Sequence, residues 1–321
     1  MANSNYPHGF NGGVSIRDLP LALTPPGKVF WVSNSSVMLA GQKAGSNGNP
    51  GTFNAPFSTL DYAIGMCTAH RGDTIFVKPG HAESLTAADG VDVDVAGVTI
   101  IGLGRGTKRP KFTYDNSAGE FVIGAANVRI ENLWFVPSVT GITKAIDVEN
   151  GSTGFEIVGC RFGDAETAGT DEFNATIIVA AASTDGLIAD NYINMGEAGA
   201  VAAITITGAC DRLAIRNNVI LGDYSTANIN SITALQNDLM ITDNILVNGV
   251  TSALNTEPTI ELLTGSSGVI ARNFSATNVA TLAAHQVNDT AANFQNYFTE
   301  DRGSGNTAAA SAVSVVASAD D

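Results

Sequence analysis

Basic residues and long apolar runs are scarce in this chain of 321 residues, and each scarcity excludes a class of protein. Only 16 side chains are Lys or Arg against 31 Asp or Glu, which gives a formal net charge of -15. Such an acidic surface repels phosphate groups, so we expect no nucleic-acid partner. No run approaches about 18 apolar residues, and residues 1–10 lack the basic and apolar parts of an export signal. We therefore expect synthesis in the cytosol and no contact with a membrane.

Cysteine and histidine are also few. The three cysteines, Cys67, Cys160 and Cys210, stand far apart and are odd in number, which predicts no disulfide framework. We interpret Cys67 and Cys160 as small core residues. The four histidines fall in loops or terminal segments, and none has the spacing of a metal-binding pair. We expect no metal and no cofactor.

What the sequence does contain is a repeat. A β-branched apolar residue returns roughly every 23 to 31 residues, and a period this short describes one coil of a solenoid. A second apolar residue usually stands two positions earlier, so both face inward from one β-strand. The proposed anchors of the coils are Val77, Ile100, Ile130, Ile157, Ile188, Ile215, Ile241 and Ile270.

Asparagine occupies the third position after the anchor in the later coils. The residues are Asn191, Asn218, Asn244 and Asn273. Asparagine tolerates the left-handed backbone of a sharp corner, and stacked asparagine side chains can bond to the coils above and below. We predict an asparagine ladder along one corner.

A second column of apolar residues precedes the anchors. It consists of Ile146, Ile177, Ile204, Ile232 and Ile260. Two parallel strands per coil, joined by a return segment of variable length, predict an all-β, right-handed parallel β-helix (solenoid) with an N-terminal capping helix and extended terminal segments. The predicted boundaries are 1–50 for an N-terminal arm and first strand, 51–279 for the β-helix, and 280–321 for a C-terminal cap and tail.

Residues 56–64 and 72–80 resemble the entry to the pectate-lyase-like right-handed β-helix superfamily, in which a short helix plugs the first coil. Ser58 is then the expected N-cap, with Leu60, Ile64 and Cys67 on one helical face. The superfamily includes polysaccharide lyases, phage tailspikes and phage virion proteins, so the resemblance specifies the fold and leaves the chemistry open.

The lyases and hydrolases that this fold resembles use acids stacked on adjacent coils. The outward positions beside the anchors offer no such cluster, and Glu156 beside Arg129 predicts an ion pair between coils. In the second column, three uncharged positions separate Asp147 from Glu261. We therefore expect no catalytic residue.

Two groups of acids have other interpretations. Asp190 and Asp243 precede ladder positions and are expected to cap turns. The longest insertion is acidic and favours a solvated loop, with a loop site as the alternative. Its acids are Asp164, Glu166, Asp171 and Glu172.

Several outward positions are apolar, which is unusual for a soluble monomer. The candidates for a subunit interface are Ile178, Leu187, Met240, Val158 and Val269. We expect Ile178, Leu187 and Met240 to lie on successive coils and to form one continuous stripe. Side-by-side trimers are common among elongated phage β-helix proteins, so the analogy favours a homotrimer.

These expectations favour a non-enzymatic virion structural protein of a tailed bacteriophage, a trimeric capsid decoration or cement protein. Its partners would be copies of itself and the major capsid protein or another virion protein, and its location would be the virion. The alternative is a tailspike or fibre protein that binds, or binds and cuts, host polysaccharide. Aromatic residues make up only 7% of the chain, and Phe76 is the single outward one in the two predicted columns, which disfavours that alternative. A secreted lyase-like enzyme is a third interpretation, which the missing export signal disfavours.

Overall fold

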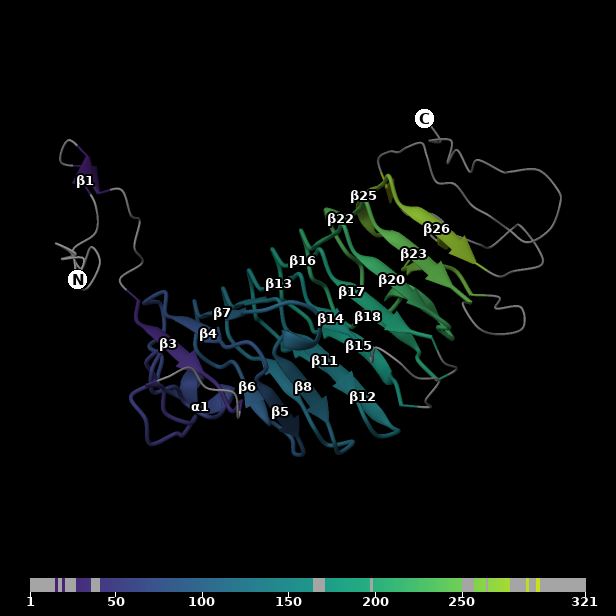
Figure 1. Cartoon of the computed structure of the whole chain (residues 1–321). Coiled ribbons are helices and arrows are strands. Elements are labelled where there is room, and N and C mark those ends of the chain that lie inside the picture. The colour runs from purple at the N-terminus through teal and green to yellow at the C-terminus, as the bar shows by residue number, and fades with distance from the viewer. Residues whose placement is uncertain are drawn as a thin grey trace.

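The computed structural model of the protein describes residues 27–35, 41–163, 171–196, 199–249, 257–263 and 265–277, together with the backbone of four short strands at 15–16, 19–20, 287–288 and 293–294. The described chain forms a parallel solenoid in which successive coils contribute one strand to each of three long sheets (Figure 1). The predicted all-β parallel solenoid is confirmed. The third sheet was not predicted. The predicted terminal segments lie largely outside the described residues.

We name the sheets in the order in which the chain visits them. Sheet I holds ten strands: β3 (Val29–Val32), β4 (Thr74–Val77), β7 (Thr99–Gly102), β10 (Arg129–Glu131), β13 (Glu156–Val158), β16 (Leu187–Ala189), β19 (Ala214–Arg216), β22 (Leu239–Thr242), β25 (Ser267–Ala271) and β28 (Asn293–Phe294). Sheet II holds eight: β5 (Ala82–Leu85), β8 (Lys111–Tyr114), β11 (Trp134–Pro137), β14 (Arg161–Phe162), β17 (Tyr192–Met195), β20 (Val219–Gly222), β23 (Ile245–Asn248) and β26 (Phe274–Thr277). Sheet III also holds eight: β6 (Val91–Asp92), β9 (Phe121–Ile123), β12 (Ile142–Val148), β15 (Phe173–Val179), β18 (Ala202–Ile206), β21 (Ala227–Ser231), β24 (Ile260–Leu262) and β27 (Val287–Asn288).

Four short elements of the described chain lie outside these sheets. They are the antiparallel pair β1 (Ser15–Ile16) and β2 (Leu19–Pro20), the helix α1 (Leu60–Gly65), and a single 3-10 turn at Gly106–Lys108. In the part of the chain that the structure describes, no helix has the length and apolar character needed to cross a membrane.

The first predicted anchor of sheet I was wrong by two residues. Ile75, rather than Val77, pairs with Ile100, and Val77 pairs with Gly102. A slip of two positions keeps the same face inward, and both residues are fully buried, so the apolar pattern could not separate the two registers. Phe30 in β3 stacks on Ile75, which adds a strand before the first predicted coil.

The second predicted column was wrong at one coil. Ile229, rather than Ile232, pairs with Ile204 and Ile260 in sheet III. Ile232 follows β21, and 44% of its surface is exposed. Sheet III also begins two coils earlier than predicted, with β6 and β9, whose inward residues include Phe121.

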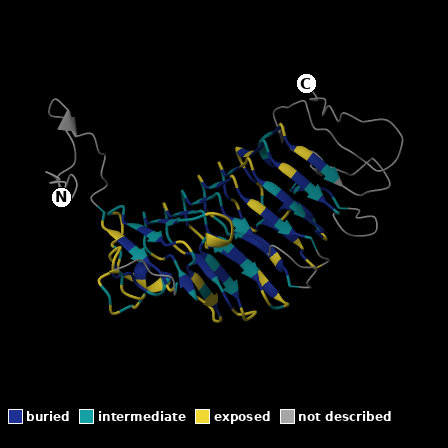
Figure 2. Cartoon of the chain, viewed as in Figure 1, coloured by how far each residue is buried: buried dark blue, intermediate teal, exposed yellow. Residues whose placement is uncertain are grey.

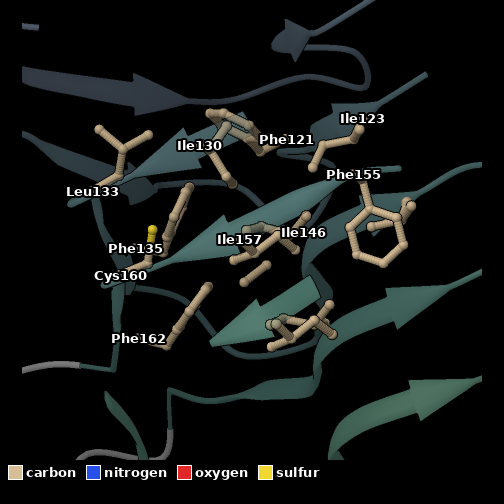
Figure 3. Close-up of a cluster of buried hydrophobic side chains, with 14 of the residues drawn as sticks. Phe121, Ile123, Ile130, Leu133, Phe135, Ile146, Phe155, Ile157, Cys160 and Phe162 are labelled. Atoms are coloured by element: carbon tan, nitrogen blue, oxygen red, sulfur yellow. The ribbon is translucent and has the colours of Figure 1, made fainter. Parts of the chain in front are cut away.

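Sheet II was missed because its strands lie inside the segment interpreted as a variable return. Their inward positions are aromatic in the early coils: Phe112 stacks on Phe135 at 5.8 Å between ring centroids, and Phe135 on Phe162 at 5.0 Å. Figure 3 shows Phe135 and Phe162 side by side in the core, close to Ile130 and Cys160. Each fully buried ring or aliphatic side chain contributes roughly 1.5 to 3 kcal/mol of transfer free energy.

The N-terminal coil is closed by α1, but Ser58 is not its cap. The cap position is Thr59, whose side chain makes no capping bond. Instead Oε2 of Glu83 accepts the first helical N–H, that of Leu60, at 3.0 Å. Ser58 bonds through its hydroxyl to Oδ1 of Asn47 at 2.8 Å. The predicted helical face does face the core, because Leu60 and Ile64 are buried.

Candidate functional site

The four ladder asparagines form one buried column at the corner between sheets I and II. Nδ2 of Asn191 donates to Oδ1 of Asn218 at 3.0 Å, and Asn218 donates in the same way to Asn244 at 3.0 Å. Asn244 donates to Asn273 at 2.9 Å, and Asn273 donates to the carbonyl of Ile241 at 2.9 Å. None of the four is more than 1% exposed.

The ladder residues themselves are not the left-handed residues of the corner. That backbone belongs to the preceding positions, where φ is 58° at Asp190, 54° at Asn217 and 60° at Asp243. The corner therefore separates two roles: the preceding residue makes the turn, and the following asparagine bonds along the stack. Asp243 also pairs with Arg272 of the next coil, with Oδ1 to Nε at 2.6 Å.

The predicted interface stripe does not exist as one surface. Leu187, Met240 and Val269 share an outward row of sheet I, with Ala214 between the first two. Val158 lies in the neighbouring outward row of that sheet. Ile178 lies on β15 in sheet III, so Ile178, Leu187 and Met240 are neither on successive coils nor on one face. The prediction of a continuous stripe was wrong because Ile178 lies beside Ile177 of the second column, whereas Leu187 and Met240 lie beside anchors of the first, and the two columns belong to different sheets.

A row of basic and aromatic side chains crosses the N-terminal half of sheet II. Lys111, Trp134, Arg161 and Tyr192 are direct register neighbours on β8, β11, β14 and β17. The Arg161 guanidinium lies 5.1 Å from the centroid of the Trp134 ring and 5.5 Å from that of Tyr192. We call these four residues the basic-aromatic row. Trp134 and Tyr192 are outward aromatic residues that were not predicted from the sequence, because sheet II lies outside the two predicted columns.

Further bases precede the row in the connection from β7 to β8. Arg105 and Lys108 are exposed there, and Arg109 is half-buried. Together with two bases of the row they form what we call the basic group, which consists of Arg105, Lys108, Arg109, Lys111 and Arg161. Within the described residues none of the five forms an ion pair. Burial lowers the pKa of Arg109, and the positive charge of Arg161 lowers it further. The basic group is therefore a patch without ion pairs on an acidic protein.

The C-terminal half of sheet II is apolar on its outward face. Ile245 pairs with Val219 on one side and Phe274 on the other, and a parallel outward row carries Leu221 and Val247. Ile245 is 43% exposed and Phe274 is 41% exposed, whereas Val219, Leu221 and Val247 are half-buried. Figure 2 shows exposed stretches in yellow on the strands towards the C-terminal end of the solenoid. We call these five residues the apolar half, and they form a contiguous, partly exposed apolar surface.

Sheet III carries acids at its N-terminal end. Asp92 and Glu149 approach each other beside Gly124: a Cβ at that glycine would lie 3.3 Å from Oδ1 of Asp92 and 3.1 Å from Oε2 of Glu149. Burial, together with the negative charges of Asp94, Asp89, Glu149 and Asp61, raises the pKa of Asp92 to about 6.

These acids form what we call the acidic cluster, which consists of Asp61, Asp89, Asp92, Asp94 and Glu149. This group was not predicted from the sequence, because β6 and β9 were not recognised as strands; Asp92 lies on β6 and Glu149 follows β12, with the coil of β9 between them. Even so, no group of three or more His, Cys, Asp or Glu side chains in the described residues is arranged to hold a metal ion.

The remaining candidate acids have structural partners where they are described. The predicted ion pair is present, because Glu156 contacts Nη1 of Arg129 while Glu131 accepts from Nη2 at 2.9 Å. Glu172 is buried and accepts the N–H of Ala200 at 3.2 Å. Asp171 is half-buried at the start of the segment that leads into β15. Asp164 and Glu166 lie outside the described residues.

No protein-family model matches this chain, and no curated protein matches it. Solved structures give distant matches. The chain is similar to a rhamnogalacturonan lyase at 12% identity and a TM-score of 0.40, covering 86% of this chain and 89% of the lyase. It is also similar to a tailspike protein mutant of E. coli bacteriophage HK620 in complex with pentasaccharide, at 12% identity and a TM-score of 0.40. That match covers 79% of this chain and 48% of the tailspike chain.

A third match is the GH136 lacto-N-biosidase from Eubacterium ramulus, at 11% identity and a TM-score of 0.38, covering 87% of this chain and 68% of that one. These are distant matches between parallel β-helix proteins. They assign no activity, substrate or partner to this chain.

Proposed function

We propose that this protein is a non-enzymatic structural protein of a tailed bacteriophage particle, which works as a homotrimer that decorates or cements the capsid. The observation that carries the proposal is the apolar half of sheet II. Burial of its five side chains against another molecule would release roughly 5 to 15 kcal/mol by transfer free energy before association costs. A surface of this kind favours an obligate contact.

The organisation of the described chain supports the same proposal. The solenoid offers three long, flat faces, and its corner is fixed by buried side-chain bonds that repeat along the stack. A rod with an apolar surface on half of one face suits a protein that attaches to a shell. In the proposal, residues 1–27 attach this rod to the major capsid protein or to another virion protein.

Two measurements test the proposal. Light scattering of the purified full chain should give the mass of a trimer at micromolar concentration, and the chain should add to particles that lack it. Deletion of residues 1–27 should leave the trimer intact and reduce the amount bound to particles. A wild-type chain that stays monomeric and binds no particle would refute the proposal.

A second candidate function is a tailspike or fibre that binds host polysaccharide. The basic-aromatic row favours it, because exposed rings stack on sugar faces and neighbouring bases pair with acidic sugars. Calorimetry with an acidic host polysaccharide tests this candidate, with Tyr192→Ala as the variant and Tyr62→Ala as the control, since both tyrosines are about 40% exposed. Binding that Tyr192→Ala removes and Tyr62→Ala retains would favour this candidate over the first.

The non-enzymatic part of the proposal has its own test. We expect no unsaturated or reducing sugar to be released from pectate or from host capsular polysaccharide. Turnover that disappears in Asp92→Asn or Glu149→Gln would establish the acidic cluster as a catalytic site. Turnover that disappears in Asp171→Asn or Glu172→Gln would place the site near β15 instead.

A further inference from the structure

We infer that copies of this chain associate through unlike faces, with the basic group on sheet II of one copy against the acidic cluster on sheet III of the next. The inference rests on the proposed homotrimer and specifies its contact. An arrangement in which one face meets a different face of the neighbour is heterologous, and it closes into a ring when the rotation is a simple fraction of a turn.

Charge complementarity carries the inference. Several other bases of the described chain are paired within the subunit, as Arg71 is with Asp73, Arg212 with Asp185 and Arg272 with Asp243. Exposed bases without an ion pair, such as Lys43 and Arg216, also occur elsewhere, but they stand singly and form no cluster. The five bases of the basic group have no such partner. The five acids of the acidic cluster likewise form no ion pair within the described residues, and burial, with their mutual repulsion as a further cause, raises the pKa of Asp92. Each patch therefore lacks the charge that the other patch supplies.

The two patches lie at nearly the same height along the solenoid. The acidic cluster surrounds β6, β9 and β12, and the basic group surrounds β8, β11 and β14. These sets of strands are offset by about one coil, or about 4.8 Å, which is within the reach of Lys and Arg side chains. Rotation about an axis parallel to the solenoid brings equal heights together, so both patches can meet in one closed ring.

The C-terminal coils carry apolar residues on both sheets. The apolar half of sheet II lies on β20, β23 and β26. Sheet III presents Ile178 on β15, and exposed Val201 and Ile232 lie beside β18 and β21. These apolar residues lie two coils below the apolar half, in the same direction as the one-coil offset between the charged patches. The charged patches therefore fix the placement of sheet II against sheet III, and the apolar residues follow it to within about one coil.

Charge reversal tests the contact. The first variant, Arg105→Glu, Lys108→Glu and Lys111→Glu, leaves two bases beside three acids in the sheet II patch and makes it acidic. The second variant, Asp61→Lys, Asp94→Lys and Glu149→Lys, leaves two acids beside three bases in the sheet III patch and makes it basic. We expect each variant to need at least about tenfold more protein to form the trimer at low salt, because like charges then face each other. The control Lys43→Glu with Arg216→Glu reverses two exposed bases elsewhere and should leave the mass unchanged. Circular dichroism and melting temperature verify the fold of each variant.

Combination of the two reversals distinguishes this geometry from others. A chain carrying both reversed patches should regain the trimer, because its faces are complementary again. An equimolar mixture of the two singly reversed proteins should not close a ring of three, because unlike copies must alternate and three is an odd number. Recovery of a trimer in the mixture would overturn the unlike-face arrangement.

The remaining outcomes separate this inference from the proposed function. If the wild-type chain is a trimer and neither charge reversal weakens it, the inferred contact is wrong, and the proposal of a homotrimer is unaffected. A wild-type chain that is monomeric at all concentrations would overturn both. Loss of binding to an acidic polysaccharide in the first variant, with an unchanged trimer mass, would also overturn the inference and would assign the basic group to the glycan-binding alternative.

Discussion

Nδ2 of Asn218 donates to Oδ1 of Asn244 over 3.0 Å in the corner of the solenoid, and both side chains are almost completely buried. Oδ1 of Asn244 also accepts the backbone N–H of Asn218 at 2.9 Å, so this one oxygen satisfies two donors of the preceding coil. The ladder thus ties each coil to the next in addition to the sheet hydrogen bonds.

Asn244→Ala should therefore lower the free energy of unfolding by about 1 to 3 kcal/mol, because the buried donors of Asn218 lose their acceptor and the oxygens of Asn273 and Ile215 lose the Nδ2 donor. Thermal or urea unfolding followed by circular dichroism measures the change. Asn174→Ala, at an exposed position of β15, is the control and should unfold like the wild type. Equal melting temperatures for Asn244→Ala and the wild type would show that the ladder contributes nothing to stability.

The ladder also shows how much a sequence pattern reveals. Its four asparagines could be predicted because side chains that stack at one corner recur with the period of the coil, which remains readable without any structure. Likewise, the two columns of β-branched residues indicated parallel stacked strands, and that prediction of the fold was correct.

The candidate site could not be predicted in the same way, because both of its patches depend on strands that were not recognised. The strands of sheet II are as short as Arg161–Phe162, and their inward residues change from phenylalanine to isoleucine along the stack, so no constant column marks them. Asp92 and Glu149 are far apart in the chain, and only the register of β6, β9 and β12 brings them together.

Asp92 makes stability depend on pH in the direction opposite to most carboxylates. Its pKa rises from 3.8 to about 6 on folding, so the folded state binds the proton more tightly between these values. Stability contributed by the protonated form is present in full below about pH 3.8 and is lost as the pH rises toward 6. Asp92→Asn should stabilise the protein at pH 7 by on the order of 1 kcal/mol, discounted for partial exposure, and should have little effect at pH 3.5. Melting curves at both pH values test this, and equal shifts at the two values would contradict it.

Asp73 should show the opposite sign. Burial alone would raise its pKa, but the bonds from Arg71 and from the N–H groups of Thr68 and Lys28 outweigh burial and hold the pKa below 3.8. The N–H of Lys28 donates to Oδ1 at 2.6 Å, which ties the segment before β3 to the first coil. The stabilising contribution is therefore present above about pH 4 and is lost as the pH falls through the lowered pKa. Asp73→Asn should cost about 1 to 3 kcal/mol at pH 7, and the difference from wild type should shrink toward pH 3.

Met240 and Ile245 are a matched pair for locating the subunit contact. They are exposed to 46% and 43%, both are aliphatic, and they lie five residues apart on β22 and β23 of the same coil, but Met240 is on sheet I and Ile245 on sheet II. If copies associate through sheets II and III, a charge at residue 245 is desolvated without a partner and should split the trimer at micromolar concentration. Met240→Glu should remain trimeric, because sheet I faces away from that contact. Light scattering of Ile245→Glu and Met240→Glu measures both masses under one condition.

The opposite result would locate the contact elsewhere. If Ile245→Glu is a trimer and Met240→Glu is a monomer, the contact lies on sheet I, where Leu187 and Val269 share the row of Met240.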